Sequence, residues 1–221
     1  MNETFFIAKQ NCSKEPFISS ANRTKRLNWC NAHKDWTPEQ WNAVIFSDET
    51  PVHIVQNNQK RRIRCFKSEL LKPNNIRPTL HSGGGKISIW GCFYSAKVGP
   101  VIQISNRTMA RDYLELLNSF FYEHMTLADL KKCMLGQITF QHDNAPCHTA
   151  SCVKKWFADN KFSLLSWPPQ SPDLNPIENL WARVKQRMDS QCLYSKEDLM
   201  PSFLNIWSAT SNSYRKHAPS H

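Results

Sequence analysis

The chain has 221 residues, a formal net charge of +10 and 40% hydrophobic residues. This length suits one domain with a sizeable core, and thirteen Pro against six Gly indicate rigid loops rather than a low-complexity chain. The positive charge favours a polyanionic partner, nucleic acid first and an anionic membrane surface second. No apolar run approaches the roughly 18 residues that span a bilayer, and the N-terminus lacks the pattern of a signal peptide.

The eight cysteines are scattered along the chain and form no C-x-x-C pair. Cys147, His148 and Cys152 lie close together in sequence and could suggest zinc. A structural zinc site normally has two closely spaced ligand pairs, and the sequence contains no second pair. We therefore interpret the cysteines as reduced thiols of an intracellular protein.

The first predicted elements are a basic lead-in and a pair of strands. Residues 1–36 are polar and basic and include a helix, and Thr37-Pro38 is a typical helix start because Thr caps well and Pro suits the first helical position. The run "AVIFSDE" and the run "PVHIVQ" after it have the composition of strands. A basic, irregular stretch follows from 57 to about 80.

The elements after this stretch alternate between strands and helices. Glycines at 83–85 break the chain before an expected hairpin, and helical spacing of apolar residues predicts the first of the later helices. The order predicts an α/β protein with a mixed central sheet flanked by helices. In chain order we expect a hairpin, a helix, a strand, a helix, a strand and two helices: 87–94 with 98–105, 108–130, 137–143, 149–160, 162–168, one from Pro176, and 196–208.

Three carboxylates are placed where such a fold could bring them together. Asp48 and Asp143 each end a predicted strand, so both emerge at one edge of the sheet if the strands are neighbours. Glu178 lies in the first turn of a helix that Asn175 can cap and Pro176 can begin. Three carboxylates suit a pair of Mg²⁺ ions, which stabilise the attacking and leaving oxygens of a phosphoryl displacement.

The same residues also have a simpler interpretation. Asp48 and Asp143 could be ordinary strand-end turn residues, and Glu178 a favourable charge near a helix N-terminus. Glu49 and Asp173 are neighbouring carboxylates that compete for the same roles. The pattern of elements leaves these alternatives open.

The residue identities within the motifs are more specific than the spacing between them. The segments "VIFSDET", "WGCF", "FQHDNAPCHTA" and "LLSWPPQSPDLNPIENLWARVK" closely resemble the catalytic domain of the mariner-type DDE transposases, in the Tc branch. In this chain 34 residues lie between Asp143 and Glu178, which is the spacing of that branch. The resemblance runs from about Pro16 to about Trp207.

The resemblance implies an RNase H-like fold and a catalytic, metal-binding triad of Asp48, Asp143 and Glu178 that holds two Mg²⁺ or Mn²⁺ ions. It also implies hydrolysis of DNA at transposon ends, followed by attack of the freed 3′-OH on target DNA at TA. Asn144 and His148 belong to the second motif and are expected to order the metal ligands. For each of them the alternative is a helix cap or a loop hydrogen bond.

Double-stranded DNA is the expected partner, and the nucleus is the expected location. In relatives the segment after the first Asp forms a clamp between two subunits. We therefore expect residues 57–80 to make the same contact, in a homodimer bound to DNA. Trp90, Trp167 and Trp181 are expected in the core rather than as base-stacking platforms. The candidate phosphate-binding residues, for which a solvated surface is the alternative, are Lys60, Arg61, Arg62, Arg64, Lys67, Lys154, Lys155, Arg183 and Lys185.

We divide the chain into a lead-in (1–36), a catalytic domain (37–208) and a divergent tail (209–221). Relatives carry paired helix-turn-helix domains ahead of the catalytic domain, so we expect DNA-end recognition by this chain to be weak or absent. Two rival interpretations are a non-catalytic DNA-binding remnant or domesticated regulator, and a generic RNase H-like nuclease.

Overall fold

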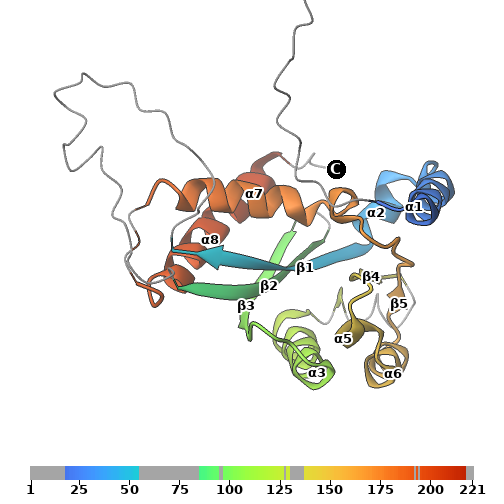
Figure 1. The fold of residues 1–221 in the computed structure, drawn as a ribbon, viewed down its shortest axis with the longest axis horizontal. Coiled ribbons are helices and arrows are strands. Elements are labelled where there is room, and N and C mark those ends of the chain that lie inside the picture. Colours follow the sequence, from blue (N-terminus) through green and yellow to red (C-terminus); the bar gives the residue numbers. More distant parts are fainter. Residues whose placement is uncertain are drawn as a thin grey trace, which may run out of the picture.

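The structure is a computed structural model that describes residues 18–54, 85–94, 97–126, 128–129, 137–191, 193 and 195–217. Its centre is a five-stranded sheet in the order β3-β2-β1-β4-β5 (Figure 1). The strands β1, β2 and β3 are antiparallel, whereas β4 and β5 run parallel to β1. The strands are β1 Val44–His53, β2 Lys86–Tyr94, β3 Lys97–Ile104, β4 Thr139–Gln141 and β5 Ser163–Leu164.

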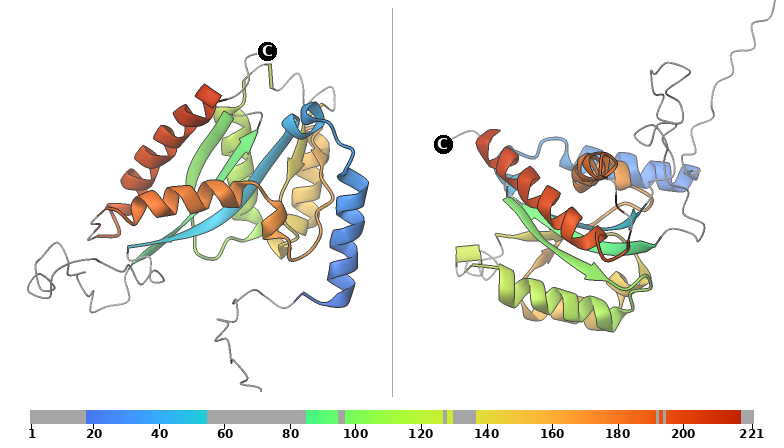
Figure 2. Two further views of the ribbon diagram at one scale, coloured as in Figure 1. Left: turned by 90° about the horizontal axis from the view of Figure 1, so that it is seen from above. Right: turned by 90° about the vertical axis from the view of Figure 1, so that its left-hand side faces the viewer.

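Helices cover both faces of the sheet. The helices α7 and α8 lie on one face, and α3, α5 and α6 lie on the other (Figures 1 and 2). The bounds are α1 Ser20–His33, α2 Pro38–Asn42, α3 Ala110–Ser119, the π-helix η3 Phe120–His124, α5 Pro146–Thr149, α6 Ser151–Asp159, the 3-10 helix η4 Pro172–Leu174, α7 Ile177–Met188 and α8 Leu199–His217. The predicted mixed sheet with flanking helices is confirmed.

The alternation of side chains along β1 divides the core into two layers. Ile45 faces α3 and α6 and packs in one cluster with Tyr113 and Phe140. Val52 faces α7 and α8 and packs in another cluster with Trp181. Odd-numbered residues of β1 therefore point to the α3 side of the sheet and even-numbered residues to the α7 side.

An aromatic cluster joins α1 and α2 to the first residues of β1. The rings of Trp29, Trp36 and Trp41 pack against one another and against the buried pair Phe46 and Trp167. The predicted capping by Thr37 is present, since its hydroxyl accepts from the N–H of Gln40. Through these contacts the basic lead-in helix is held beside the loop that precedes α7 (Figure 2).

The prediction of two strands on either side of Thr50 is wrong, because β1 runs without a break from Val44 to His53. A strand tolerates Pro51 here because β4 pairs with β1 only as far as Phe46, and beyond that point this side of β1 is a sheet edge.

Three further elements differ in extent from their predictions. The helix expected over 108–130 contains α3 and η3 and ends at His124, and the helix expected over 149–160 is interrupted at Ala150, whose ψ of 145° is not helical. The strand expected over 162–168 pairs only at Ser163–Leu164.

The last helix, α8, continues past residue 208 to His217. The division of the chain at residues 36 and 208 stays a prediction. Among the described residues, no helix has the length and apolar content needed to cross a bilayer.

Candidate active site

Asp48 and Asp143 occupy equivalent positions on neighbouring parallel strands. The pairing of β1 with β4 ends at Phe46 and Gln141, and each Asp lies two residues further along. Past this point the Gln141 side chain takes the place of the backbone hydrogen bonds between the strands, because its Oε1 accepts from the N–H of Ser47 at 3.2 Å. The predicted neighbourhood of the two strands is confirmed. Asp48, however, lies in the middle of β1, and Asp143 follows the end of β4.

Glu178 reaches the same region from the first turn of α7. The helix begins at Ile177, one residue later than the Pro176 start expected from the sequence, so Pro176 rather than Asn175 is its N-cap residue. Asn175, the residue before the cap, still accepts from the N–H of Ile177 through its Oδ1 at 3.3 Å. The apolar stripe of this helix is buried against the sheet, with Leu180, Trp181 and Val184 at most 3% exposed. Burial of this stripe fixes the end of the helix from which Glu178 projects.

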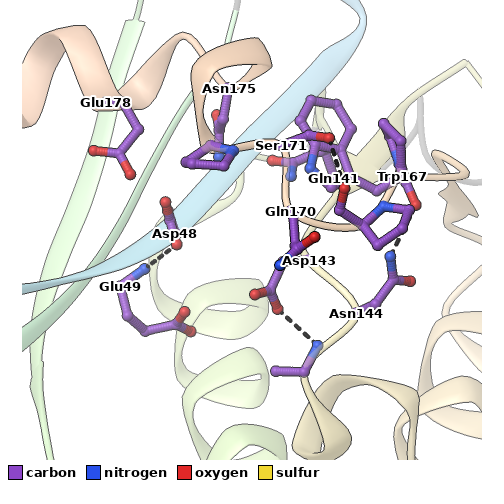
Figure 3. Close-up of a pocket in the computed structure, with 14 residues that line it drawn as sticks. Asp48, Glu49, Gln141, Asp143, Asn144, Trp167, Gln170, Ser171, Asn175 and Glu178 are labelled. Carbon is purple, nitrogen blue, oxygen red and sulfur yellow. Dashed lines mark hydrogen bonds between the residues drawn. The ribbon is translucent and has the colours of Figure 1, made fainter. Parts of the chain in front are cut away.

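The three carboxylates line one cavity of about 480 Å³. Figure 3 shows Asp48 on β1 and Glu178 on α7 with their carboxylates turned toward the same open space, and Asp143 across it. Glu49 also lines this cavity, and the loop from Trp167 to Pro172 forms its far wall. The sequence indicated Glu49 only as a competing carboxylate and did not indicate this wall, because only the tertiary fold brings the loop beside the carboxylates.

The Asp48 carboxyl has a strongly perturbed pKa. Burial raises it most, repulsion by Glu49, Glu178 and Asp143 raises it further, and the hydrogen bond from the Glu49 N–H opposes the change, so the pKa is about 8. The cavity therefore disfavours negative charge on Asp48 in the absence of a cation. Such a cluster of carboxylates is a typical environment for a divalent ion.

Asp143 is held in its ionised form by two donors on one oxygen. Its Oδ1 accepts from the Ala145 N–H at 2.9 Å and from His148 Nδ1 at 2.7 Å. Burial alone would raise the pKa of this carboxyl, but the hydrogen bonds from His148 and Ala145 outweigh it, and the pKa lies below its usual value.

His148 lies between two carboxylates. Its Nδ1 contacts Asp143, and its Nε2 lies 3.3 Å from Glu49 Oε1. Burial alone would lower the pKa of this imidazole, but the hydrogen bonds to Asp143 and Glu49 raise it to about 10. His142, stacked on the same ring, has a pKa lowered to about 3 by burial and by repulsion from His148.

Asn144 and Asp173 have other contacts. The Asn144 amide donates to the backbone oxygen of Trp167 at 2.8 Å, which is the loop hydrogen bond considered as its alternative role. Asp173 forms a two-pronged ion pair with Arg26 at 2.7 and 2.6 Å. This pair occupies the Asp173 carboxylate, so Asp173 is a poor competitor for a metal.

The described residues contain no group of three or more His, Cys, Asp or Glu side chains gathered closely enough to hold one ion. The cavity nevertheless supplies what Mg²⁺ and Mn²⁺ prefer, since Asp48, Asp143 and Glu178 present carboxylate oxygens to a shared open space. These residues fit divalent ions that would take their remaining ligands from water and phosphate oxygens.

Four of the predicted basic residues lie in the part of the chain that the structure describes. Lys154 and Lys155 are exposed on α6, and Lys155 forms an ion pair with Asp159. Arg183 is exposed on α7, whereas Lys185 is half-buried, close enough to Glu178 and Asp48 to be attracted by both. Residues Lys60, Arg61, Arg62, Arg64 and Lys67, and the clamp-like stretch 57–80, lie outside the described residues.

The expected burial of three tryptophans is confirmed. Trp90, Trp181 and Trp167 are 0%, 1% and 8% exposed, respectively. Trp167 also lines the cavity that holds the carboxylates, which the sequence did not indicate.

Comparison with known proteins identifies the family. Residues 43–200 match the model of the DDE superfamily endonucleases. The chain belongs to this family. It is 32% identical over 200 residues to the transposable element Tc1 transposase of Caenorhabditis elegans, and 34% identical over 176 residues to the Tcb1 transposase of Caenorhabditis briggsae. These matches place it among DDE catalytic domains of the Tc1/mariner type.

The matched regions cover unequal shares of the chains compared. The Tc1 match covers 89% of this chain and 70% of the relative, and the Tcb1 match covers 79% and 62%. In relation to full transposases of the family, this DDE chain therefore corresponds to about two thirds of their length.

Solved structures confirm the expected RNase H-like fold. The mariner Mos1 paired-end complex with Mg aligns with 98% of this chain and 65% of its own, with a TM-score of 0.71 and 18% identity. The catalytic domain of Mos1 transposase aligns with 92% of this chain and 95% of its own, with a TM-score of 0.58 and 16% identity. At these identities the likeness concerns the fold of the DDE domain.

Proposed function

We propose that this DDE domain cuts DNA strands and joins the freed ends to target DNA, with Asp48, Asp143 and Glu178 as ligands of two Mg²⁺ or Mn²⁺ ions. The observation that carries the proposal is the convergence of these three carboxylates, from β1, from the end of β4 and from α7, on one cavity. The expected chemistry is hydrolysis of a phosphodiester, then attack of the freed 3′-OH on a second phosphodiester.

The ions, when bound, neutralise charge on the phosphate and favour ionisation of the attacking water or 3′-OH. The protein contributes position. Hydrogen bonds from Ala145 and His148 orient Asp143, and the buried stripe of α7 fixes the helix that carries Glu178. Asp48 is fixed by its place in β1, which pairs with β2. Because phosphoryl transfer is catalysed mainly by positioning and charge neutralisation, this rigid frame is what the reaction requires.

Double-stranded DNA is the proposed substrate, in keeping with the net charge of +10, and the proposed location is the nucleus. We also propose a homodimer in the DNA complex. Support comes from the relative described as a Mos1 paired-end complex, whose fold this chain shares. Lys154, Arg183 and Lys185, with the basic stretch 57–80, are the proposed DNA contacts. Lys155, the remaining candidate, is paired with Asp159, and we expect it to contribute less.

The test is nicking of supercoiled plasmid by the purified chain in Mg²⁺ and in Mn²⁺. The variant Asp143→Asn keeps the size of the side chain and an oxygen that can accept from His148, but it removes the charge. We expect it to abolish nicking. The matched control is Asp159→Asn on the exposed surface of α6, which we expect to nick like the unmodified chain.

Equal nicking by Asp143→Asn and the unmodified chain would contradict the proposed triad. If the unmodified chain binds DNA in a salt-dependent manner but nicks it in neither metal, it is a non-catalytic DNA-binding protein derived from a transposase.

A further inference from the structure

Glu49 is connected to Asp143 through a single buried side chain. Its Oε1 lies 3.3 Å from Nε2 of His148, and Nδ1 of the same ring lies 2.7 Å from Asp143 Oδ1. The His148 side chain is only 3% exposed, whereas that of Asp143 is 56% exposed. The imidazole therefore has a carboxylate at each ring nitrogen and connects two residues that both line the cavity.

Packing fixes the plane of the His148 ring. The ring of His142 stacks on it at 5.0 Å with an interplanar angle of 5°, and the ring of Tyr113 lies 4.1 Å away. Tyr113 and His142 are themselves joined, since the Tyr113 hydroxyl lies 3.1 Å from His142 Nδ1. The stacked rings prevent the imidazole from tilting out of its plane. Its contacts with Glu49 and Asp143 then restrict rotation of the ring within that plane.

The position of Glu49 in β1 explains why it meets His148. Asp48 points to the α7 side of the sheet, so the next residue points to the α3 side, where α5 carries His148. The backbone N–H of Glu49 also donates to Asp48 Oδ1 at 2.8 Å. One residue thus contacts Asp48 through its backbone and Asp143 through a bridging ring.

We propose that Glu49 is a positioning residue of the reaction, which holds His148 so that His148 holds Asp143 in the orientation that binds metal. This inference rests on the proposed function of Asp143. Both described hydrogen bonds of that carboxylate end on Oδ1. Oδ2 is thereby left for the ion, and rotation of the carboxylate away from the cavity costs two hydrogen bonds.

The proposal distinguishes Glu49 from a metal ligand. A ligand would be required at every metal concentration, whereas a residue that acts through His148 changes mainly the metal concentration needed. Partners that orient a metal ligand from behind typically change metal affinity by about 10- to 100-fold.

The experiment compares the variants Glu49→Ala, Glu49→Gln and Asp143→Asn. The control is Glu115→Gln, because the Glu115 side chain on α3 is exposed to solvent. The first readout is Mn²⁺ binding to the DNA-free protein by electron paramagnetic resonance. The second is nicking as a function of Mn²⁺ concentration. The third is the amide resonance of Ala145 in the metal-free protein, because this N–H donates to Asp143 Oδ1.

We expect Glu49→Ala to weaken Mn²⁺ binding about tenfold and to raise the Mn²⁺ concentration for half-maximal nicking by a similar factor, with the maximal rate within about threefold of the unmodified chain. Its Ala145 amide resonance should shift. Glu49→Gln keeps an oxygen near Nε2 and should recover most of the affinity. Glu115→Gln should match the unmodified chain in all three readouts.

Two outcomes overturn the proposal while the proposed function stands: Glu49→Ala with unchanged Mn²⁺ binding and an unchanged Ala145 resonance, or Glu49→Ala and Glu49→Gln that are inactive at every Mn²⁺ concentration. The first outcome would show that Glu49 does not act on Asp143, and the second would show that Glu49 is a metal ligand. If instead Asp143→Asn binds Mn²⁺ and nicks like the unmodified chain, the proposed function itself fails, and with it this inference.

Discussion

The side-chain amide of Asn175 joins the strand that carries Asp48 to the helix that carries Glu178, because its Nδ2 donates to the backbone oxygen of Ser47 at 3.2 Å. Its Oδ1 accepts from the N–H of Ile177, the first residue of α7. Asn175 is 4% exposed, so both hydrogen bonds are shielded from water. One side chain therefore links the two elements that carry Asp48 and Glu178, in addition to the buried stripe of α7.

We expect Asn175→Ala to lower the free energy of unfolding by about 1–3 kcal/mol, because the Ser47 oxygen and the helix N-terminus both lose their partner. Nicking should fall by about tenfold or more, because Glu178 is displaced relative to Asp48. Asn175→Ser can still cap Ile177 but cannot reach Ser47, and should recover stability more than activity. Urea unfolding and plasmid nicking measure both, with exposed Asn179→Ala as the control. Equal activity in all four proteins would contradict the assignment.

Gly91 is the cross-strand partner of Asp48, and it leaves room for a buried ring of α7. A Cβ at this position would lie 2.6 Å from Cη2 of Trp181, which is 1% exposed and cannot move aside without displacing the helix. We expect Gly91→Ala to destabilise the protein by about 1–3 kcal/mol and to reduce nicking, because α7 carries Glu178.

The control for Gly91 is Gly85→Ala. Its added Cβ would lie 3.1 Å from Cβ of Lys196 and 3.2 Å from Cδ1 of Ile54, so a shift of a few tenths of an ångström relieves these contacts, whereas the 2.6 Å contact at Gly91 needs a larger movement. Thermal unfolding of the two variants checks the prediction. A larger loss of stability in Gly85→Ala than in Gly91→Ala would show that the contact with Trp181 is unimportant.

The pair formed by Arg26 and Asp173 attaches α1 to the wall of the cavity. Arg26 also donates to the backbone oxygen of Gln170, and its side chain is 18% exposed against 58% for Asp173. A double-mutant cycle with Arg26→Gln and Asp173→Asn should give a coupling free energy of about 0.5–1 kcal/mol at low salt, reduced at 1 M NaCl.

The pair Lys155 and Asp159, which is exposed and within one helix, is the matched comparison. We expect its coupling to be at most about 0.5 kcal/mol. If urea unfolding gives equal coupling for the two pairs, α1 is not held by its ion pair with the loop.

The raised pKa of Asp48 gives the metal-free protein a defined pH dependence. Between pH 3.8 and about 8 the unfolded chain has lost this proton and the folded chain still holds it, so stability falls as pH rises through that range. Asp48→Asn cannot ionise and escapes this loss. We expect the variant to be more stable than the unmodified chain by at least about 1 kcal/mol at pH 9, and by little at pH 4.

Urea unfolding at the two pH values, with and without Mg²⁺, measures this difference. Added Mg²⁺ should stabilise the unmodified chain at pH 9 and leave Asp48→Asn nearly unchanged. A gain in stability of equal size at pH 4 and pH 9 would contradict the link to the Asp48 proton.

Lys185 and Lys155 lie in opposite environments and should differ in effect. Burial lowers the pKa of Lys185 against the attraction of Glu178 and Asp48, whereas the Lys155 ammonium is exposed and paired with Asp159. We expect Lys185→Gln to reduce Mg²⁺-dependent nicking by about tenfold, since it removes a positive charge that is attracted by Glu178 and Asp48. Lys155→Gln should stay within about twofold. Equal effects in the nicking assay would mean that proximity to the carboxylates is irrelevant.

Local sequence determined much of this protein. The order of strands and helices follows from side-chain periodicity and capping residues, and Thr37 caps α2 where the sequence placed a cap. Asn175 lies one residue before the N-cap of α7 and binds its first N–H. The motifs around Asp48, Asp143 and Glu178 identified the family, because side chains with chemical roles leave a pattern that depends little on packing.

Only the tertiary structure decided how these residues meet. The strand β1 continues past Thr50 because it pairs with β2 as far as His53, and it tolerates Pro51 because β4 stops pairing with it at Phe46. No local pattern contains either pairing. The bridge from Glu49 through His148 to Asp143 joins residues almost one hundred positions apart. Such contacts are set by the register of two strands and by the burial of an imidazole, and these are properties of the whole packed core rather than of any segment.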